Sequence, residues 1–242
     1  NYNDDIVSDR SYTIELTYNT ANYFIPYFSE SSSTYNVVIS GGTSTRTKTI
    51  TPSAANSLQM LNISPQAINA EYPGNFTTST TSYSVQVAGK TYVVNIVCEG
   101  LYTNYHVHFM NKYGGYETML FNKVSRKSYA VERKTYQQLP YRVSSSGVVS
   151  VKTGNVMYQQ KTDFAGRFTE KMKLNTDWLS DTDYQWLAQL VTSPNVYVED
   201  SGTIYPVSIS STNYEFKQHI VDGLINLMIE VDFATSYKTQ FK

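Results

Sequence analysis

The sequence predicts a mainly β protein: a β-sandwich or barrel with one flanking α-helix, preceded by a smaller β-rich domain. Apolar and polar residues alternate along most of the chain, and clusters of turn residues separate the alternating segments. Only one segment combines helical spacing with start and stop signals. Composition agrees, because 22 Tyr and 54 Ser plus Thr occur in 242 residues and β-structure favours Tyr and Thr. We expect the smaller domain over residues 1–98 and the sandwich over residues 99–242.

The N-terminal domain begins with a half-buried strand in which Ile14 and Leu16 alternate with Thr13 and Glu15. Further strands are expected at residues 22–28 and 36–40, and a hairpin at residues 83–87 and 92–97 around Ala88-Gly89-Lys90. Residues 43–81 are rich in Thr, Ser and Pro and are predicted to be irregular, with a short apolar piece at residues 58–63.

The second domain opens with a hairpin in which Gly114-Gly115 joins two strands. The last strand has the most regular alternation, with five apolar residues on one face. The strands expected here are residues 105–109, 116–121, 128–133, 148–156, 167–174, 196–199 and 205–210, then the strand of Ile225, Leu227, Ile229, Val231 and Phe233.

One helix is predicted over residues 181–192. Ser180 is a suitable N-cap, and the acidic residues Asp181 and Asp183 in the first turn suit the helix dipole. Leu179 and Tyr184 occupy the positions of a hydrophobic staple, and Ser193-Pro194 ends the helix. Its apolar face is expected to pack on a sheet through Leu187, Leu190 and Val191.

The residues that usually carry catalysis are scarce, with 3 His and 1 Cys. His106 and His108 share one face of a strand, but a metal site would need a third ligand and His219 is the only other histidine. We expect both to point outward, and Cys98 to be a buried thiol at the end of a strand. The sequence contains no phosphate-binding loop, dinucleotide-binding glycine motif, zinc-protease motif or nucleophile elbow. The prediction is therefore a protein that is not an enzyme, with no catalytic residues, metal or cofactor.

Charge is unevenly distributed along the chain. Residues 112–173 carry a net charge of +8, whereas residues 1–111 carry −3 and residues 174–242 carry −6. A basic segment between acidic ends suits charge-complementary contacts between copies, or contact with a polyanion such as DNA passing alongside. Because Tyr is a frequent interface residue, we predict that this segment includes an interface. Its candidate residues are Lys123, Arg126, Lys127, Tyr129, Arg133, Lys134 and Tyr136.

No apolar run approaches the roughly 20 residues that a membrane helix needs, and no signal peptide is visible. The sequence therefore predicts no membrane contact.

Short segments between Cys98 and Phe233 resemble structural proteins of tailed bacteriophages. The likeness is to proteins of phages with Bacteroidetes hosts, the crAss-like group included, and covers a little over half of the chain. The segments are residues 105–115, 125–128, 133–136, 177–181, 186–190, 192–197, 206–209 and 214–217.

This resemblance implies a virion component that assembles in rings or stacks, in the tail or the head-to-tail region. The implied partners are copies of the chain and other virion proteins, and the implied location is the virion, assembled in the bacterial host cytoplasm. An alternative is a glycan-binding β-sandwich, either a phage receptor-binding module or a bacterial surface protein. Trp178 and Trp186 would be its first sugar-stacking candidates.

Overall fold

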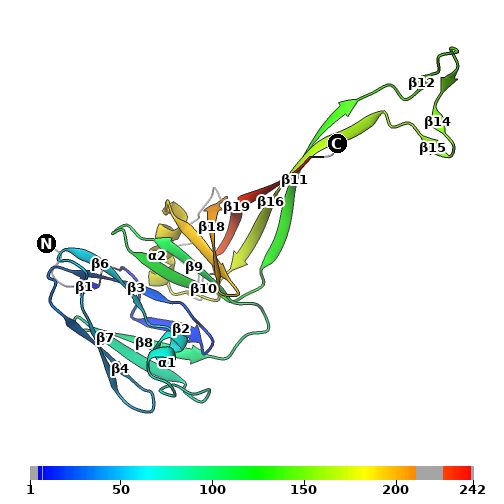
Figure 1. Ribbon diagram of the computed structural model, residues 1–242. Coiled ribbons are helices and arrows are strands. Elements are labelled where there is room, and N and C mark those ends of the chain that lie inside the picture. Colours follow the sequence, from blue (N-terminus) through cyan, green and yellow to red (C-terminus); the bar gives the residue numbers. More distant parts are fainter. Residues whose placement is uncertain (1–4, 7, 211–225, 241–242) are drawn as a thin grey trace.

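The computed structural model describes residues 5–6, 8–210 and 226–240, and it confirms a mainly β fold with packed sheets and a flanking helix (Figure 1). The N-terminal elements are β1 (Asp5–Ile6), β2 (Thr13–Thr17), β3 (Phe24–Ser29), β4 (Tyr35–Ser40), β5 (Arg46–Ile50), β6 (Ser57–Asn62), α1 (Pro65–Glu71), β7 (Ser82–Val87) and β8 (Lys90–Val97). The elements that follow are β9 (Tyr105–Met110), β10 (Tyr116–Phe121), β11 (Arg126–Gln137), β12 (Arg142–Val143), β13 (Val149–Ser150), β14 (Lys152–Thr153), β15 (Val156–Met157), β16 (Lys161–Asn175), α2 (Asp181–Thr192), β17 (Val196–Asp200), β18 (Thr203–Ile209) and β19 (Met228–Gln240).

The N-terminal part contains two sheets. A five-stranded sheet has the order β2-β8-β7-β4-β5, and a three-stranded sheet has the order β1-β3-β6. Apolar residues from both sheets and from α1 form one buried cluster, which includes Ile14, Tyr27, Leu61, Ile68 and Val85. Burying apolar surface between two layers is the main source of stability for such an arrangement.

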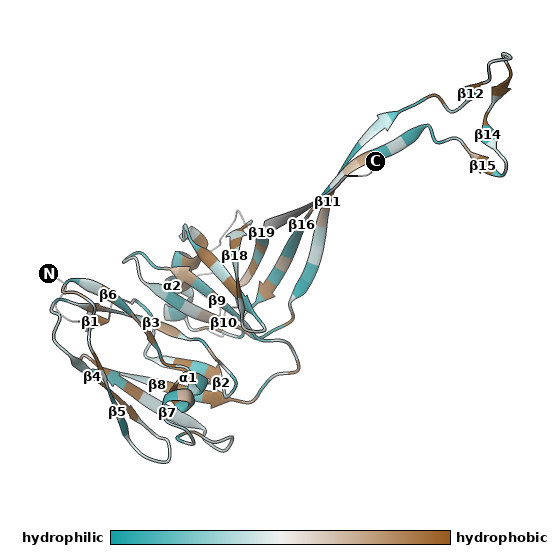
Figure 2. Cartoon of the chain, in the orientation of Figure 1, coloured by the Kyte–Doolittle hydropathy of each residue, from teal (hydrophilic) through white to brown (hydrophobic). Residues whose placement is uncertain are grey.

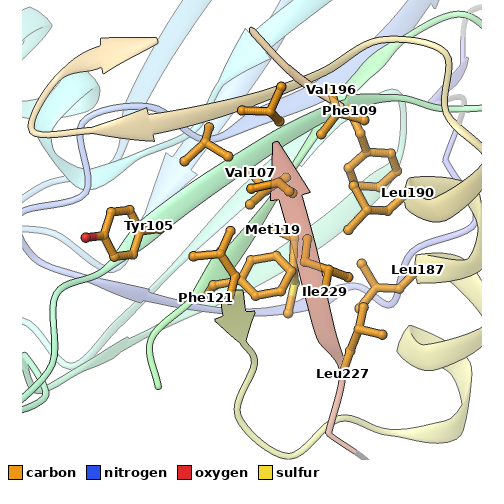
Figure 3. Close-up of a cluster of buried hydrophobic side chains, with 14 of the residues drawn as sticks. Tyr105, Val107, Phe109, Met119, Phe121, Leu187, Leu190, Val196, Leu227 and Ile229 are labelled. Carbon is orange, nitrogen blue, oxygen red and sulfur yellow. The ribbon is translucent and has the colours of Figure 1, made fainter. Parts of the chain in front are cut away.

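The C-terminal part is built on a seven-stranded sheet with the order β10-β9-β17-β18-β19-β16-β11. Helix α2 covers one face, and the cluster between them is separate from the N-terminal one. Figure 3 shows Val107 and Phe109 of β9 with Leu187 and Leu190 of α2 and Ile229 of β19 in this core. The alternation predicted for the last strand is confirmed for its described residues, since Leu227, Ile229, Val231 and Phe233 are all buried. Ile225 lies outside the described residues.

The predicted helix over residues 181–192 is confirmed as α2. The Ser180 hydroxyl accepts a hydrogen bond from the Asp183 backbone N–H at 3.2 Å, as its N-cap position predicts. Leu187 and Leu190 are fully buried against the sheet, whereas Val191 is only half-buried. Trp186 is buried as well and stacks near Phe109, with 5.3 Å between the ring centroids. No helix among the described residues is both long and apolar enough to cross a bilayer.

The prediction that residues 43–81 are irregular is wrong. They contain β5, β6 and a second helix, α1. Strand β5 carries mostly Thr and Lys, so its alternation has little apolar contrast and pairing with β4 defines it instead. Helix α1 has an N-cap at Ser64 and a proline at its first position, which are local start signals, but it is only seven residues long.

Two further expectations are corrected. Residues 148–156 do not form one strand, because β13 ends before Val151 and a turn at Gly154, which has a positive φ, separates β14 from β15. Cys98 is exposed rather than buried, because β8 ends at Val97 and the chain leaves the sheet there. The hairpins predicted at β7–β8 and β9–β10 are confirmed.

Candidate assembly arm and the buried seam between the two parts

Strands β11 and β16 continue well beyond the core and form an arm that projects from the C-terminal part, away from the N-terminal sheets (Figure 1). We call residues 126–168 the arm. The register of β16 against β19 shifts between Thr169 and Lys171, and the pairing of β18 with β19 reaches no farther than Phe233. A bulge bends a strand, so the sheet leaves the body at this point. Beyond it, β19 still pairs with β16 as far as Gln240.

The arm carries many apolar side chains that nothing in this chain covers, and Figure 2 shows hydrophobic residues on it out to its tip. None of its residues belongs to either buried cluster. Single exposed apolar residues are normal on a protein surface, but a dense group of them indicates an interaction site. Its large apolar residues with more than a third of their surface exposed are Tyr129, Val131, Tyr136, Leu139, Tyr141, Val143, Val148, Val149, Val151, Val156, Met157 and Phe164.

One face of the arm is a continuation of the core-facing side of the sheet. Lys127 is the cross-strand partner of the buried Met172, and Val131 is the partner of Phe168 farther out. Paired residues share a face, so the side that α2 covers in the body runs on uncovered along the arm. Tyr129 and Phe168 are in edge contact there, with 5.8 Å between ring centroids. This face forms an open groove of about 1290 Å³.

The structure distributes the predicted interface residues over two faces and the base of the arm. Tyr129 and Arg133 line the groove, whereas Tyr136 contacts Phe164 on the opposite face. Strand alternation places Arg126 and Lys134 on that opposite face as well.

Two predicted interface lysines are tied to the body of the same chain. The Lys123 ammonium lies 2.6 Å from Asp177, and the Lys127 ammonium lies 2.7 Å from Asp200. The two ion pairs therefore attach the base of the arm to the body. Neither holds Arg126, Arg133 or Lys134, which remain able to contact another protein. Of these, Arg133 has only an exposed contact to Asp163 at 3.6 Å.

Charge separates the arm from the rest of the chain. Eight basic and two acidic residues give residues 126–168 a net charge of +6. The whole chain carries −1, so all remaining residues together carry −7. Opposite charges on two separate surfaces of one chain favour contact between copies.

The predicted outward histidines lie instead in a buried seam, where the N-terminal part covers the face of the C-terminal sheet opposite α2. His108 is 4% exposed and His106 is 9% exposed. The prediction failed because strand alternation shows only that the two histidines face away from the core of their own sheet. It carries no signal that another part of the chain packs on that face.

A line of hydrogen bonds crosses this seam. The Phe24 N–H donates to the Thr118 hydroxyl at 3.1 Å, and that oxygen lies 2.8 Å from His108 Nδ1. His108 Nε2 lies 3.2 Å from Glu199, whose other oxygen accepts from the Asn22 amide at 2.9 Å. A carboxylate can only accept, so His108 carries its proton on Nε2 and accepts from Thr118 at Nδ1. Burial lowers the pKa of His108, which favours this neutral form.

Thr118, His108 and Glu199 have the connectivity of a nucleophile–base–carboxylate triad. Thr118 is nevertheless fully buried, and its hydroxyl is already used by Phe24 and His108. A nucleophile must reach its substrate, so we interpret the group as a polar contact that docks the two parts. Among the described residues no group of three or more His, Cys, Asp or Glu side chains is placed to hold a metal ion. His219 lies outside them.

Arg10 forms a second contact across the seam. Its guanidinium lies between the rings of Tyr23 and Trp186, 4.9 Å and 4.6 Å from their centroids, and donates to the Thr118 carbonyl at 2.9 Å. The Trp186 indole N–H donates to the buried carboxyl of Glu117. Burial raises the pKa of Glu117, despite the opposing effect of its hydrogen bonds and of Arg10.

The two parts also approach closely at their backbones. A Cβ atom at Gly115, in the β9–β10 turn, would lie 2.4 Å from the Cβ of Pro26. Only glycine fits this contact, so the turn that the sequence predicted is also a docking point.

Comparison with known proteins gives no match: no protein-family model, curated protein or solved structure resembles the chain closely enough to be a relative.

Proposed function

We propose that this chain is a non-enzymatic structural component of a bacteriophage particle, in the tail or the head-to-tail region, that assembles in multiple copies. The observation that carries the proposal is the arm, a long projection with an apolar surface and a net charge of +6. No residue of the arm belongs to either buried cluster. An exposed apolar surface of this kind is typical of a chain that buries it against partner proteins.

The chemistry of the arm favours a protein partner. Exposed Tyr, Val and Met residues stabilise a complex by being buried, while the basic residues fix register and partner choice. A single exposed ion pair contributes only about 0–1 kcal/mol, so the apolar residues supply most of the affinity. Copies of the chain and other virion proteins are the proposed partners, and the virion assembled in the host cytoplasm is the proposed location. The placement in a phage particle rests on the sequence resemblance.

The test is to reverse the free basic residues of the arm. Arg126→Glu, Arg133→Glu and Lys134→Glu together should block assembly, measured as particle mass by light scattering across a concentration series. Lys123 and Lys127 are left unchanged because Asp177 and Asp200 bind them within the chain. The circular dichroism and melting midpoint of the variant should match the parent, since no substituted residue is buried.

Two outcomes would count against the proposal. Normal assembly of the triple variant would remove the arm from the interface, and a parent chain that stays monomeric at every concentration would argue against self-assembly. If the basic residues instead meet DNA, the parent should bind DNA without a protein neighbour, with an affinity that falls steeply as salt rises.

Glycan binding is the second candidate, and one observation favours it. Trp178 is 61% exposed and borders a cavity of about 380 Å³ that polar and apolar residues line together. An exposed aromatic face beside hydrogen-bonding groups can stack on a sugar ring. Trp186, the other sugar-stacking candidate, is buried in the core and is not available. Retention on a glycan array that Trp178→Ala abolishes would support this function.

A further inference from the structure

We propose that the surface on a neighbouring copy that receives the arm is the cavity at Trp178. This inference rests on the proposed self-assembly and names the second half of that contact. We call the residues Glu15, Asp177, Trp178 and Asp183, which border this cavity, the Trp178 patch.

The patch combines an exposed aromatic ring with carboxylates from both parts of the molecule. Glu15 lies on β2 of the N-terminal part and is exposed. Asp177 and Trp178 lie between β16 and α2, and Asp183 lies in the first turn of α2. The ring and the carboxylates therefore surround one opening. A cation placed over the ring would be attracted by the π face and by the negative charge of the carboxylates.

The charges that could oppose such a cation are already neutralised or covered. Lys123 is held by Asp177 at 2.6 Å. Arg10 also borders the cavity, but its guanidinium is packed between two rings and bonded to the Thr118 carbonyl. Glu15 is exposed, and no ion pair holds it among the residues that the structure describes, whereas Asp183 interacts with the charge of Arg10 and its Oδ1 is buried. The patch therefore favours an arginine or lysine over a neutral sugar.

The backbone at Trp178 is held before any partner arrives. Its backbone N–H donates to Asp177 at 2.8 Å, and Asp177 is held in turn by Lys123. Next to it, Leu179 is buried in the core. Because the backbone is held, only the two side-chain torsions of Trp178 need to be ordered on binding, and Trp is enriched among the residues that dominate an interface.

The partner that matches this patch is the arm of a second copy. The arm carries +6 against −7 on the rest of the chain, and its exposed arginines and lysines alternate with apolar residues that would pack around the ring. A chain cannot place its own arm there, because the arm projects away from the body (Figure 1). Contact between two different surfaces is heterologous, and repeating it builds a ring or a filament.

The experiment uses two full-length variants, each with one damaged surface. The arm variant carries Arg133→Glu and Lys134→Glu, and the patch variant carries Trp178→Ala and Glu15→Lys. Each alone should assemble with a dissociation constant raised roughly 10- to 100-fold. An equimolar mixture should form complexes of two 27.4 kDa chains and nothing larger, because one intact arm meets one intact patch. Native mass spectrometry would count the chains.

Tyr102→Ala is the matched control, because Tyr102 is also an exposed aromatic residue, at 45%, outside the patch. It should assemble like the parent. A patch variant that assembles normally would overturn the inference while leaving the proposed function intact. So would a mixture that stays monomeric under conditions where the parent assembles. If the patch variant assembles but loses binding to a glycan array, the cavity is a sugar site and not a receptor for the arm. A parent that never assembles would reject the proposed function itself.

Discussion

At the scale of single residues, the buried histidines make stability depend on pH. His106 is 9% exposed, its Nε2 is buried without a hydrogen-bond partner, and burial lowers its pKa from 6.5 to about 4. Between these two values the unfolded chain binds a proton that the folded chain does not. The free energy of unfolding should therefore fall as the pH drops from about 6.5 towards 4, by roughly 1–3 kcal/mol.

The measurement is urea unfolding at pH 7.5 and pH 5, for the parent and for His106→Gln. The variant should lose less stability on acidification, because it has no histidine to protonate at this position. Glu117 acts in the opposite direction, since its pKa is raised, so the comparison with the variant is what isolates the histidine. If the variant lost as much stability on acidification as the parent, His106 would not be the source of the pH dependence.

At the scale of elements, β19 contributes Ile229, Val231 and Phe233 to the core of the C-terminal part. Ile229 is 1% exposed in the core beneath α2, whereas its neighbour Met228 is 61% exposed. Ile229→Ala should lower the free energy of unfolding by about 2–5 kcal/mol, because it leaves a cavity. Met228→Ala is the matched control and should change it by less than about 0.5 kcal/mol. Equal effects of the two changes in urea unfolding would mean that the strand is packed differently.

The elements that the sequence predicted are those with local signals. Helix α2 has its cap, staple and stop within residues 179–194, and β9–β10 has a two-glycine turn between alternating strands. Strand β5 was missed because its residues are mostly polar. Helix α1 was missed because its seven residues are too few to show a repeated apolar face. The candidate interface residues of β11 were chosen from charge and Tyr content, but charge could not separate Lys127, which binds Asp200, from Arg133, which lines the open groove.

At the scale of the whole molecule, the arm should be separable from the fold. Gln137 and Lys161 face each other across β11 and β16, so residues 138–160 can be replaced by an Asn-Gly turn. Because the removed residues belong to neither core, the melting midpoint should stay close to that of the parent. Assembly should weaken, since eight exposed apolar side chains are removed with them. A large loss of stability, seen by differential scanning calorimetry, would show that the tip supports the body.

Large-scale features were the hardest to predict because they depend on contacts between distant segments. The chain has two buried clusters, and no pattern in the sequence indicated the seam between its two parts. Thr118, His108 and Glu199 come from three separate strands, and Asn22 and Phe24 come from the other part of the chain. No short pattern marks such a meeting, and the arm likewise looks in sequence like any other hairpin.

The strand order also gives the proposed assembly an order in time. Strand β19 lies between β18 and β16 in the sheet, although it follows both in the chain. The strand partners of the arm hairpin, β11 and β16, lie closer in sequence than β16 and β19 do, so the hairpin can form before β19 pairs with β16. The Trp178 patch needs Glu15 from the N-terminal part and Asp183 from the finished body, so it is completed last. A half-folded chain can therefore bind through its arm but has no complete Trp178 patch. Only fully folded copies would bind one neighbour through the arm and another through the patch.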